Sequence, residues 1–131
     1  MTPDDIRELF RVFGPVEVRR LFGGAGIFAD GTMFALVSDG VIYLKTDAHN
    51  APAFERERLA PFTYATKAGR RGVMSYRRMP DRLYDDPDEL AVWARDALAA
   101  AGRSGAAKSS RSGAEKSSAK AKAGLRRRLR P

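Results

Sequence analysis

The stretch that decides the fold is residues 25–45, AGIFADGTMFALVSDGVIYLK, in which two Asp-Gly pairs separate short apolar segments. Asp30-Gly31 and Asp39-Gly40 favour two-residue hairpin turns, because a type I′ turn needs positive φ at both central positions. The flanking residues are aromatic, β-branched or otherwise apolar, which is typical of half-buried strands. The pattern therefore predicts three consecutive antiparallel strands, at 25–29, 32–38 and 41–45.

Two-residue turns determine which residues face each other across these strands. They place Phe28 opposite Met33 and Ile27 opposite Phe34, and directly opposed residues share a face of the sheet. The predicted faces are Phe28, Met33, Ala35, Val37, Ile42 and Leu44 on one side, and Ile27, Phe34, Leu36, Val41, Tyr43 and Lys45 on the other. Both faces are largely apolar, so each needs a covering layer, supplied by helices or by a partner subunit. For the second face the candidates are the last helix and another copy of the chain in a homodimer.

Apolar residues at helical spacing predict helices on both sides of the strands. Residues 2–13 place four large apolar groups on one face, with Thr2 as the N-cap. A short helix is predicted over 50–59 with Asn50 as its cap, and a longer one begins at Asp86-Pro87 and stops at Gly102. The apolar stripe of this last helix is Leu90, Trp93, Ala94, Ala97, Leu98 and Ala101.

Further strands are predicted at 16–21, 62–66 and 72–78, the last two joined by a basic loop over 67–71. The element order is then α-β-β-β-β-α-β-β-α. Residues 1–101 are accordingly expected to form an α+β domain, with helices packed on an antiparallel sheet of five to six strands.

The charge of the chain divides at the end of this domain. Residues 1–101 carry 14 Lys/Arg and 15 Asp/Glu, a net charge of −1, whereas residues 102–131 carry 10 Lys/Arg and one acid, a net charge of +9. Between Gly102 and Gly124 the sequence has no Leu, Ile, Val or aromatic residue, so little can be buried to offset the cost of ordering. The segment 102–131 is predicted to be a disordered basic tail.

Such a tail can neutralise phosphates without a folded reading surface, which predicts non-specific contact with DNA or RNA. Without aromatic residues it cannot stack on bases, so little sequence preference is expected. The alternatives are a solubilising tail that binds nothing and attraction to a membrane surface, for which a bulky apolar face is lacking. The predicted phosphate-contacting residues are Lys108, Arg111, Lys116, Lys120, Lys122, Arg126, Arg127, Arg128 and Arg130.

No catalytic, cofactor or metal site is predicted. Residues 24–29 fit the pattern G-x-G-x-x-A, but a hairpin follows where a dinucleotide site needs the start of a helix, so a tight turn or bulge is favoured. The chain has no Cys, and its one histidine, His49, lies among turn-forming residues. The acids around Asp86 are explained by helix capping and the helix dipole. A triad of Ser75, His49 and an acid has no supporting motif.

The residues with the right placement for an interaction surface are Arg20, Phe22, Phe34, Leu36, Tyr43 and Lys45. Two hypotheses follow for the folded domain. It is a module that contacts a protein, or it is a small-molecule-binding or enzymatic domain with a cleft near Arg20, Tyr43 and Lys45.

The motifs also carry a family resemblance. Residues 20–28, RLFGGAGIF, with the two Asp-Gly segments, residues 61–64, PFTY, and residues 75–80, SYRRMP, resemble the N-terminal domain of the TfoX/Sxy family. The resemblance covers about residues 3–101. The chain departs from the family pattern at Leu21, where Met is usual, and at Ala25 and Phe28, where the family tends to have Tyr.

The resemblance implies an α+β domain like the secretion-chaperone-like folds, and a family whose named members regulate natural competence. It implies no catalysis. We expect the family's C-terminal domain to be missing, with the basic tail in its place. The expectation is a non-enzymatic regulatory protein in the cytoplasm, without a cofactor and without membrane contact. Its folded domain contacts an unknown protein and its tail contacts nucleic acid.

Overall fold

The computed structural model describes residues 1–21 and 23–115, and both Asp-Gly pairs form the predicted type I′ turns. Asp30 and Gly31 have φ of 51° and 76°, and Asp39 and Gly40 have φ of 51° and 74°. The turns connect three antiparallel strands whose bounds agree with prediction to within one residue. These strands are β2 (Gly24–Ala29), β3 (Thr32–Ser38) and β4 (Val41–Lys45).

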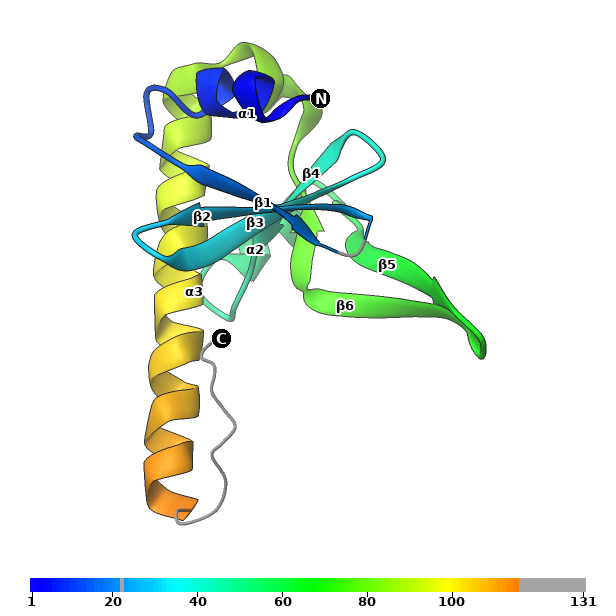
Figure 1. The fold of residues 1–131 in the computed structure, drawn as a ribbon, viewed down its shortest axis with the longest axis vertical. Helices are drawn as coiled ribbons and strands as arrows, with labels where there is room; N and C mark the ends of the chain where they lie inside the picture. Colours follow the sequence, from blue (N-terminus) through cyan, green and yellow to red (C-terminus); the bar gives the residue numbers. More distant parts are fainter. Residues whose placement is uncertain (22, 116–131) are drawn as a thin grey trace.

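Three further strands complete one antiparallel sheet with the order β1-β2-β3-β4-β6-β5 (Figure 1). They are β1 (Glu17–Leu21), β5 (Pro61–Thr66) and β6 (Gly69–Arg78). The predicted basic loop over 67–71 is wrong, because only Lys67 and Ala68 form the turn. Gly69 takes a φ of 118° and its carbonyl accepts a hydrogen bond from the Thr66 hydroxyl at 2.7 Å, which closes the hairpin early.

The predicted helices form, although two of them are shorter than expected. The helices are α1 (Pro3–Leu9), α2 (Ala51–Arg56) and α3 (Pro87–Glu115), with a 3-10 helix, η1 (Asp81–Asp85), that the sequence did not predict. The Thr2 cap is confirmed, since its hydroxyl accepts from the Asp5 N–H at 3.0 Å and its own N–H donates to the Asp5 carboxylate at 2.9 Å. Asn50 does not cap α2 with its side chain; it accepts from the Asp47 N–H and donates to the Lys45 carbonyl instead.

A β-bulge changes the predicted pairing of β2 with β3. Phe28 lies opposite Met33 as predicted, but the next pair joins Ile27 to Ala35, so Phe34 is an extra residue in β3. Because side chains alternate along a strand, one extra residue exchanges the faces beyond it. The predicted pair Ile27–Phe34 and the predicted composition of the two faces are therefore wrong. Ile27 and Phe34 are completely buried, whereas Phe28 and Met33 are only half-buried.

The core lies on a single face of the sheet. Its strand residues are Ile27, Phe34, Ala35, Val37, Ile42 and Leu44. All three helices and η1 add their buried side chains to this one cluster, and α3 packs against β3 and β4. The predicted stripe of α3 is confirmed as core. The last helix therefore covers the core face and not the second face (Figure 1).

The predicted end of α3 at Gly102 is wrong. The helix continues to Glu115 and extends past the sheet (Figure 1). A glycine costs a helix only about 1 kcal/mol, while the buried turns before it already provide the nucleus from which a helix grows. The turn after Gly102 is also held, because Arg103 Nε donates to Asp47 Oδ2 at 2.6 Å. Residues 102–115 of the expected disordered tail are thus helical, and 116–131 lie outside the described residues.

Candidate interaction face of the sheet

The second face of the sheet carries a group of aromatic and apolar side chains, which we call the aromatic face. Strand register assigns its members, because Gly26 pairs with Leu36 and Leu36 pairs with Tyr43. Ring contacts and pairing extend the group across β6 and β5. The aromatic face consists of Phe28, Met33, Leu36, Tyr43, Phe62, Tyr64 and Tyr76.

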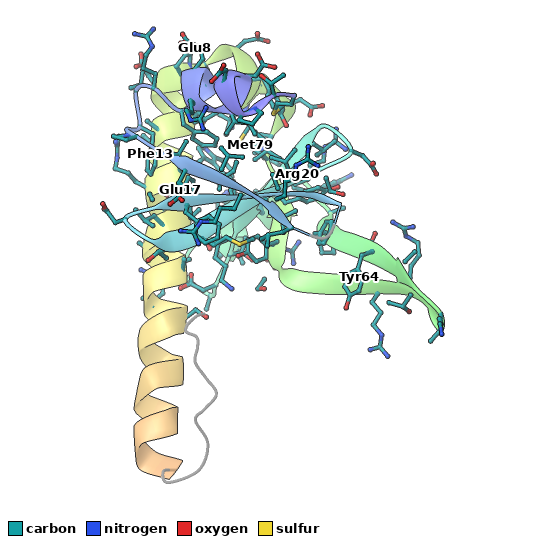
Figure 2. The ribbon with its side chains drawn as sticks, in the orientation of Figure 1. Glu8, Phe13, Glu17, Arg20, Tyr64 and Met79 are labelled. Carbon is teal, nitrogen blue, oxygen red and sulfur yellow. The ribbon has the colours of Figure 1, made fainter. Side chains whose placement is uncertain are left out.

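Three rings of this face form a continuous row. Tyr43 and Phe62 meet edge to face with ring centroids 5.1 Å apart, and Phe62 and Tyr64 lie nearly parallel at 6.2 Å and 21°. Phe62 and Tyr64 are two residues apart on β5, so both project to the same side. Tyr64 is 45% exposed and lies on the β5–β6 hairpin, which projects from the body of the sheet (Figure 2). The row therefore ends in a ring whose face is accessible.

Cationic side chains lie among these rings. Arg71 pairs with Tyr64 across the hairpin and is exposed, and Arg78 pairs with Tyr43. The Lys45 ammonium lies 5.0 Å from the centroid of the Tyr76 ring. Arg71 and Arg78 thus each lie directly opposite an aromatic residue on the neighbouring strand, and Lys45 lies beside an aromatic ring. This arrangement favours cation–π attraction.

A fourth cation lies at the β1 end of the face. The Arg19 guanidinium lies 4.5 Å from the centroid of the Phe28 ring and also contacts the Glu17 carboxylate at 3.1 Å. At the other end, Arg78 contacts Asp81 at 3.3 Å. The two carboxylates are therefore both paired with arginines, and the face as a whole is basic.

The depth of burial differs along the aromatic face. Burial raises the pKa of Tyr76 to about 12, because the phenolate form would lose its hydration. At the end of the row, by contrast, the Tyr64 side chain is 45% exposed. The face is therefore tightly packed near Lys45 and accessible along the hairpin.

The structure brings together three of the six predicted surface residues. Leu36, Tyr43 and Lys45 lie on the aromatic face, whereas Phe34 is the bulge residue and is buried on the core face, with its ring 5.6 Å from that of Phe10, which follows α1. Arg20 is exposed on β1 opposite Ala25, on the core side of the sheet edge (Figure 2). Phe22 lies outside the described residues.

The predicted cleft near Arg20, Tyr43 and Lys45 does not form. Arg20 lies on β1 and the other two residues lie on β4, with β2 and β3 between them. Strands are spaced about 4.8 Å apart, so about 14 Å separates the backbones, and Arg20 belongs to the opposite face.

Sequence reasoning missed Phe62 and Tyr76 as parts of this site. The alternation in residues 61–66, PFTYAT, does indicate that Phe62 and Tyr64 share a face. The sequence does not show that β6 pairs with β4, and this non-local pairing brings the hairpin aromatics beside Tyr43.

The glycines of residues 23–29 serve the backbone, as the tight-turn interpretation predicts. This segment forms β2, and Gly23 has a φ of 78°. A Cβ on Gly24 would lie 2.0 Å from the Val37 carbonyl oxygen, and one on Gly26 would lie 2.7 Å from Leu21 Cδ1. At Gly24 only glycine allows this approach to the backbone, and at Gly26 any larger residue would displace neighbouring side chains, so the motif is explained by strand packing.

The remaining polar clusters hold the fold together. Asp86 caps α3 by accepting from the Glu89 N–H at 3.1 Å. Arg82 joins Glu57 and Glu89, each at 2.5 Å, and so ties α2 to α3. Within residues 1–21 and 23–115, no group of three or more His, Cys, Asp or Glu is placed to hold a metal ion.

Asp47 has the most strongly lowered carboxyl pKa among those resolved. The Arg103 hydrogen bond, which outweighs the opposing effect of burial, and the N–H groups of His49 and Asn50 lower the pKa of Asp47 to about 2. These partners are structural, since they order the turn before α2 and attach α3 to it.

The predicted nucleic-acid residues divide between described and undescribed parts of the chain. Lys108 and Arg111 belong to the extended part of α3. The other predicted phosphate contacts lie outside the described residues: Lys116, Lys120, Lys122, Arg126, Arg127, Arg128 and Arg130. In the part of the chain that the structure describes, no helix has both the length and the apolar composition needed to cross a bilayer.

Comparison with known proteins agrees with the resemblance seen in the sequence. Residues 8–101 match the model of the TfoX N-terminal domain. The chain is also similar to Protein Sxy of Escherichia coli (strain K12), with 33% identity over 78 residues. That match covers 60% of this chain and 37% of Protein Sxy, so the chain spans little more than a third of the relative's length.

Proposed function

The chain belongs to the TfoX N-terminal domain family, and from this premise we propose a non-enzymatic regulatory protein of the competence-related TfoX/Sxy type that acts through contacts. Its folded domain contacts a protein partner, and its basic C-terminal segment contacts nucleic acid without sequence preference. The observation that carries the proposal is the one-sided layering of the fold. All described helices pack on one face, which leaves the opposite face and the β1 edge of the sheet for contacts.

The titratable groups support a binding role over a catalytic one. Catalytic groups have perturbed pKa values that their task requires. Here the pKa of Asp47 is lowered by Arg103, and the pKa of Arg82 is raised by its two glutamate partners. Both are explained by ion pairs that hold helices in place.

The β1 edge is the proposed place for the protein contact. β1 is the last strand of the sheet, so a partner strand can add to its outer side through main-chain hydrogen bonds. Glu17, Arg19 and Arg20 are exposed there, and charges on an edge strand oppose uncontrolled pairing between copies. A partner with an acidic residue opposite Arg20 would be selected.

A pull-down tests the protein contact. The full chain and an Arg20→Glu variant serve as bait, with Arg95→Glu, an exposed arginine on α3, as the matched control. The proposal expects a protein that is retained by the full chain and by Arg95→Glu and lost with Arg20→Glu. Equal retention by all three baits contradicts the assignment to β1.

Salt dependence tests the nucleic-acid contact. Deleting 116–131 removes seven of the ten C-terminal cations and keeps Arg103 and the described helix. If the segment neutralises about six phosphates, the logarithm of duplex affinity falls against the logarithm of salt with a slope near −5. The deletion is expected to remove most of this binding and to leave Tm unchanged. Duplex binding that survives the deletion contradicts the proposal.

A further inference from the structure

We infer that the aromatic face binds single-stranded nucleic acid, by stacking bases on its ring row and by holding the phosphates with the cations between the rings. The inference rests on the proposed role of the folded domain as a binding module. It adds a second nucleic-acid contact, distinct from that of the C-terminal segment, and it gives the face a class of ligand.

The first step is the geometry of the rings. Single strands are bound on sheets when aromatic side chains project from neighbouring strands and receive the flat faces of unpaired bases. Tyr43, Phe62 and Tyr64 form such a row, with successive centroids 5.1 and 6.2 Å apart. The exposed Tyr64 ring offers the accessible stacking position, and the neighbouring Phe62 ring lies nearly parallel to it.

The second step is charge complementarity. Arg71 lies directly opposite Tyr64, Arg78 lies opposite Tyr43, and Lys45 lies against Tyr76. Together with Arg19 these are four cations against two carboxylates, Glu17 and Asp81, which pair with Arg19 and Arg78, so four minus two leaves a net charge of +2. A ligand must therefore bring negative charge as well as flat apolar rings. A nucleic acid strand brings both in every residue, because each nucleotide has one phosphate and one base.

The third step distinguishes a single strand from a duplex. In a duplex the base faces are stacked on one another and only their edges are accessible in the grooves. The aromatic face can stack only on bases that are free of that stack. Duplex DNA can contact this face only through its phosphates, and the C-terminal segment can bind those phosphates equally well.

A second copy of the chain is a poorer occupant. A two-fold interface buries the same basic surface of both copies, so their net positive charges would be brought together without an added acidic group. Like charges placed together in this way oppose association. An acidic protein segment satisfies the charge but offers no matching row of flat groups, and it is the alternative that the experiment below tests.

Fluorescence anisotropy with full-length protein tests the inference. The probes are a labelled twelve-nucleotide oligo-dT and a labelled duplex of the same length, titrated at about 0.3 M salt, where phosphate contacts are weakened. The variants are Tyr64→Ala, Tyr64→Phe, which keeps the ring, and the control Val92→Ala, whose side chain is 50% exposed on α3. Thermal melting of each variant establishes that it is folded.

The inference expects oligo-dT to bind more tightly than the duplex. Tyr64→Ala should weaken oligo-dT binding about tenfold, the usual effect of removing one stacking ring. Tyr64→Phe and Val92→Ala should change it less than twofold, and duplex affinity should stay the same in all proteins. If Tyr64→Ala lowers Tm, Arg71→Gln provides a second test, with a larger loss of affinity for oligo-dT than for the duplex, because only the single strand is also held by the Tyr64 ring.

Two results overturn the inference. Equal affinity for oligo-dT and duplex, unchanged in the folded Tyr64 and Arg71 variants, assigns all binding to the C-terminal segment and leaves the proposed function intact. A glutamate-rich peptide that binds full-length protein in a Tyr64-dependent way, while oligo-dT binding does not depend on Tyr64, assigns the face to a protein. Loss of the proposed function itself shows separately, as absent salt-dependent duplex binding.

Discussion

Replacing Asp47 by asparagine removes the charge that holds Arg103 and keeps an acceptor for the N–H groups of His49 and Asn50. The contact joins α3 to the turn before α2 across 56 residues of sequence. The pKa of Asp47 is lowered from its ordinary value of 3.8 to about 2. At about 1.4 kcal/mol per pKa unit, this corresponds to at most about 2.5 kcal/mol of stability.

Solvent reduces that figure. The Asp47 side chain is 22% exposed and that of Arg103 is 43% exposed, so screening weakens the pair. We expect Asp47→Asn to lower the free energy of unfolding by about 1 kcal/mol at pH 7. The loss should also speed amide exchange in residues 103–115, because the contact that holds the turn after Gly102 is weakened.

The pH dependence gives the sharper test. The folded pKa of Asp47 lies below the unfolded value, so its contribution is complete above about pH 4 to 5 and is lost as the pH falls through about 2. Urea unfolding of wild type and Asp47→Asn should differ at pH 7 and converge near pH 2. Asp85→Asn, which removes an exposed carboxylate from η1, away from Arg103, is the control. The reasoning is refuted if Asp47→Asn and Asp85→Asn unfold at the same urea concentration at pH 7, or if the difference persists unchanged at pH 2.

Three further outcomes are expected from the packing. Gly24→Ala should destabilise the protein more than Gly26→Ala, because the new Cβ at residue 24 would meet the backbone carbonyl of Val37, whereas the one at residue 26 would meet movable side-chain ends. Overpacking of this kind costs about 1 to 3 kcal/mol, which urea unfolding measures. Equal losses of stability in the two variants would contradict this reasoning. Phe34→Ala should lower the free energy of unfolding by about 3 to 5 kcal/mol and Leu36→Ala by clearly less, because Phe34 is completely buried. The reverse order would show that the β-bulge is not at Phe34. In a spectroscopic alkaline titration, Tyr76 should ionise near pH 12, and the stability that its neutral form contributes below pH 10 should be lost as the pH rises through 12. The Tyr76→Phe variant should lack this late-ionising signal. A titration curve that is unchanged in the variant would contradict the burial of Tyr76.

Much of the fold follows from local signals in the sequence. The Asp-Gly turns, the Thr2 capping box and the stripe of α3 were all predictable, because each depends on residues within one or two turns of each other. The membership of the aromatic face was only partly predictable. Leu36, Tyr43 and Lys45 were found by counting along a hairpin, and counting needs no knowledge of distant strands.

The sequence by itself determined the order of the strands along the chain, the positions of the two Asp-Gly turns and the division of charge at about residue 102, because propensity, turn chemistry and composition are local properties. Tertiary structure decided the rest. The bulge at Phe34 places that ring against Phe10, the residue that follows α1, and no pattern within β3 records that partner. The end of α3 depends on Asp47, 56 residues before Arg103, and the aromatic row depends on β6 lying beside β4. Each of these features is settled by a contact between residues far apart in sequence, and its energy is available only once the sheet has brought them together.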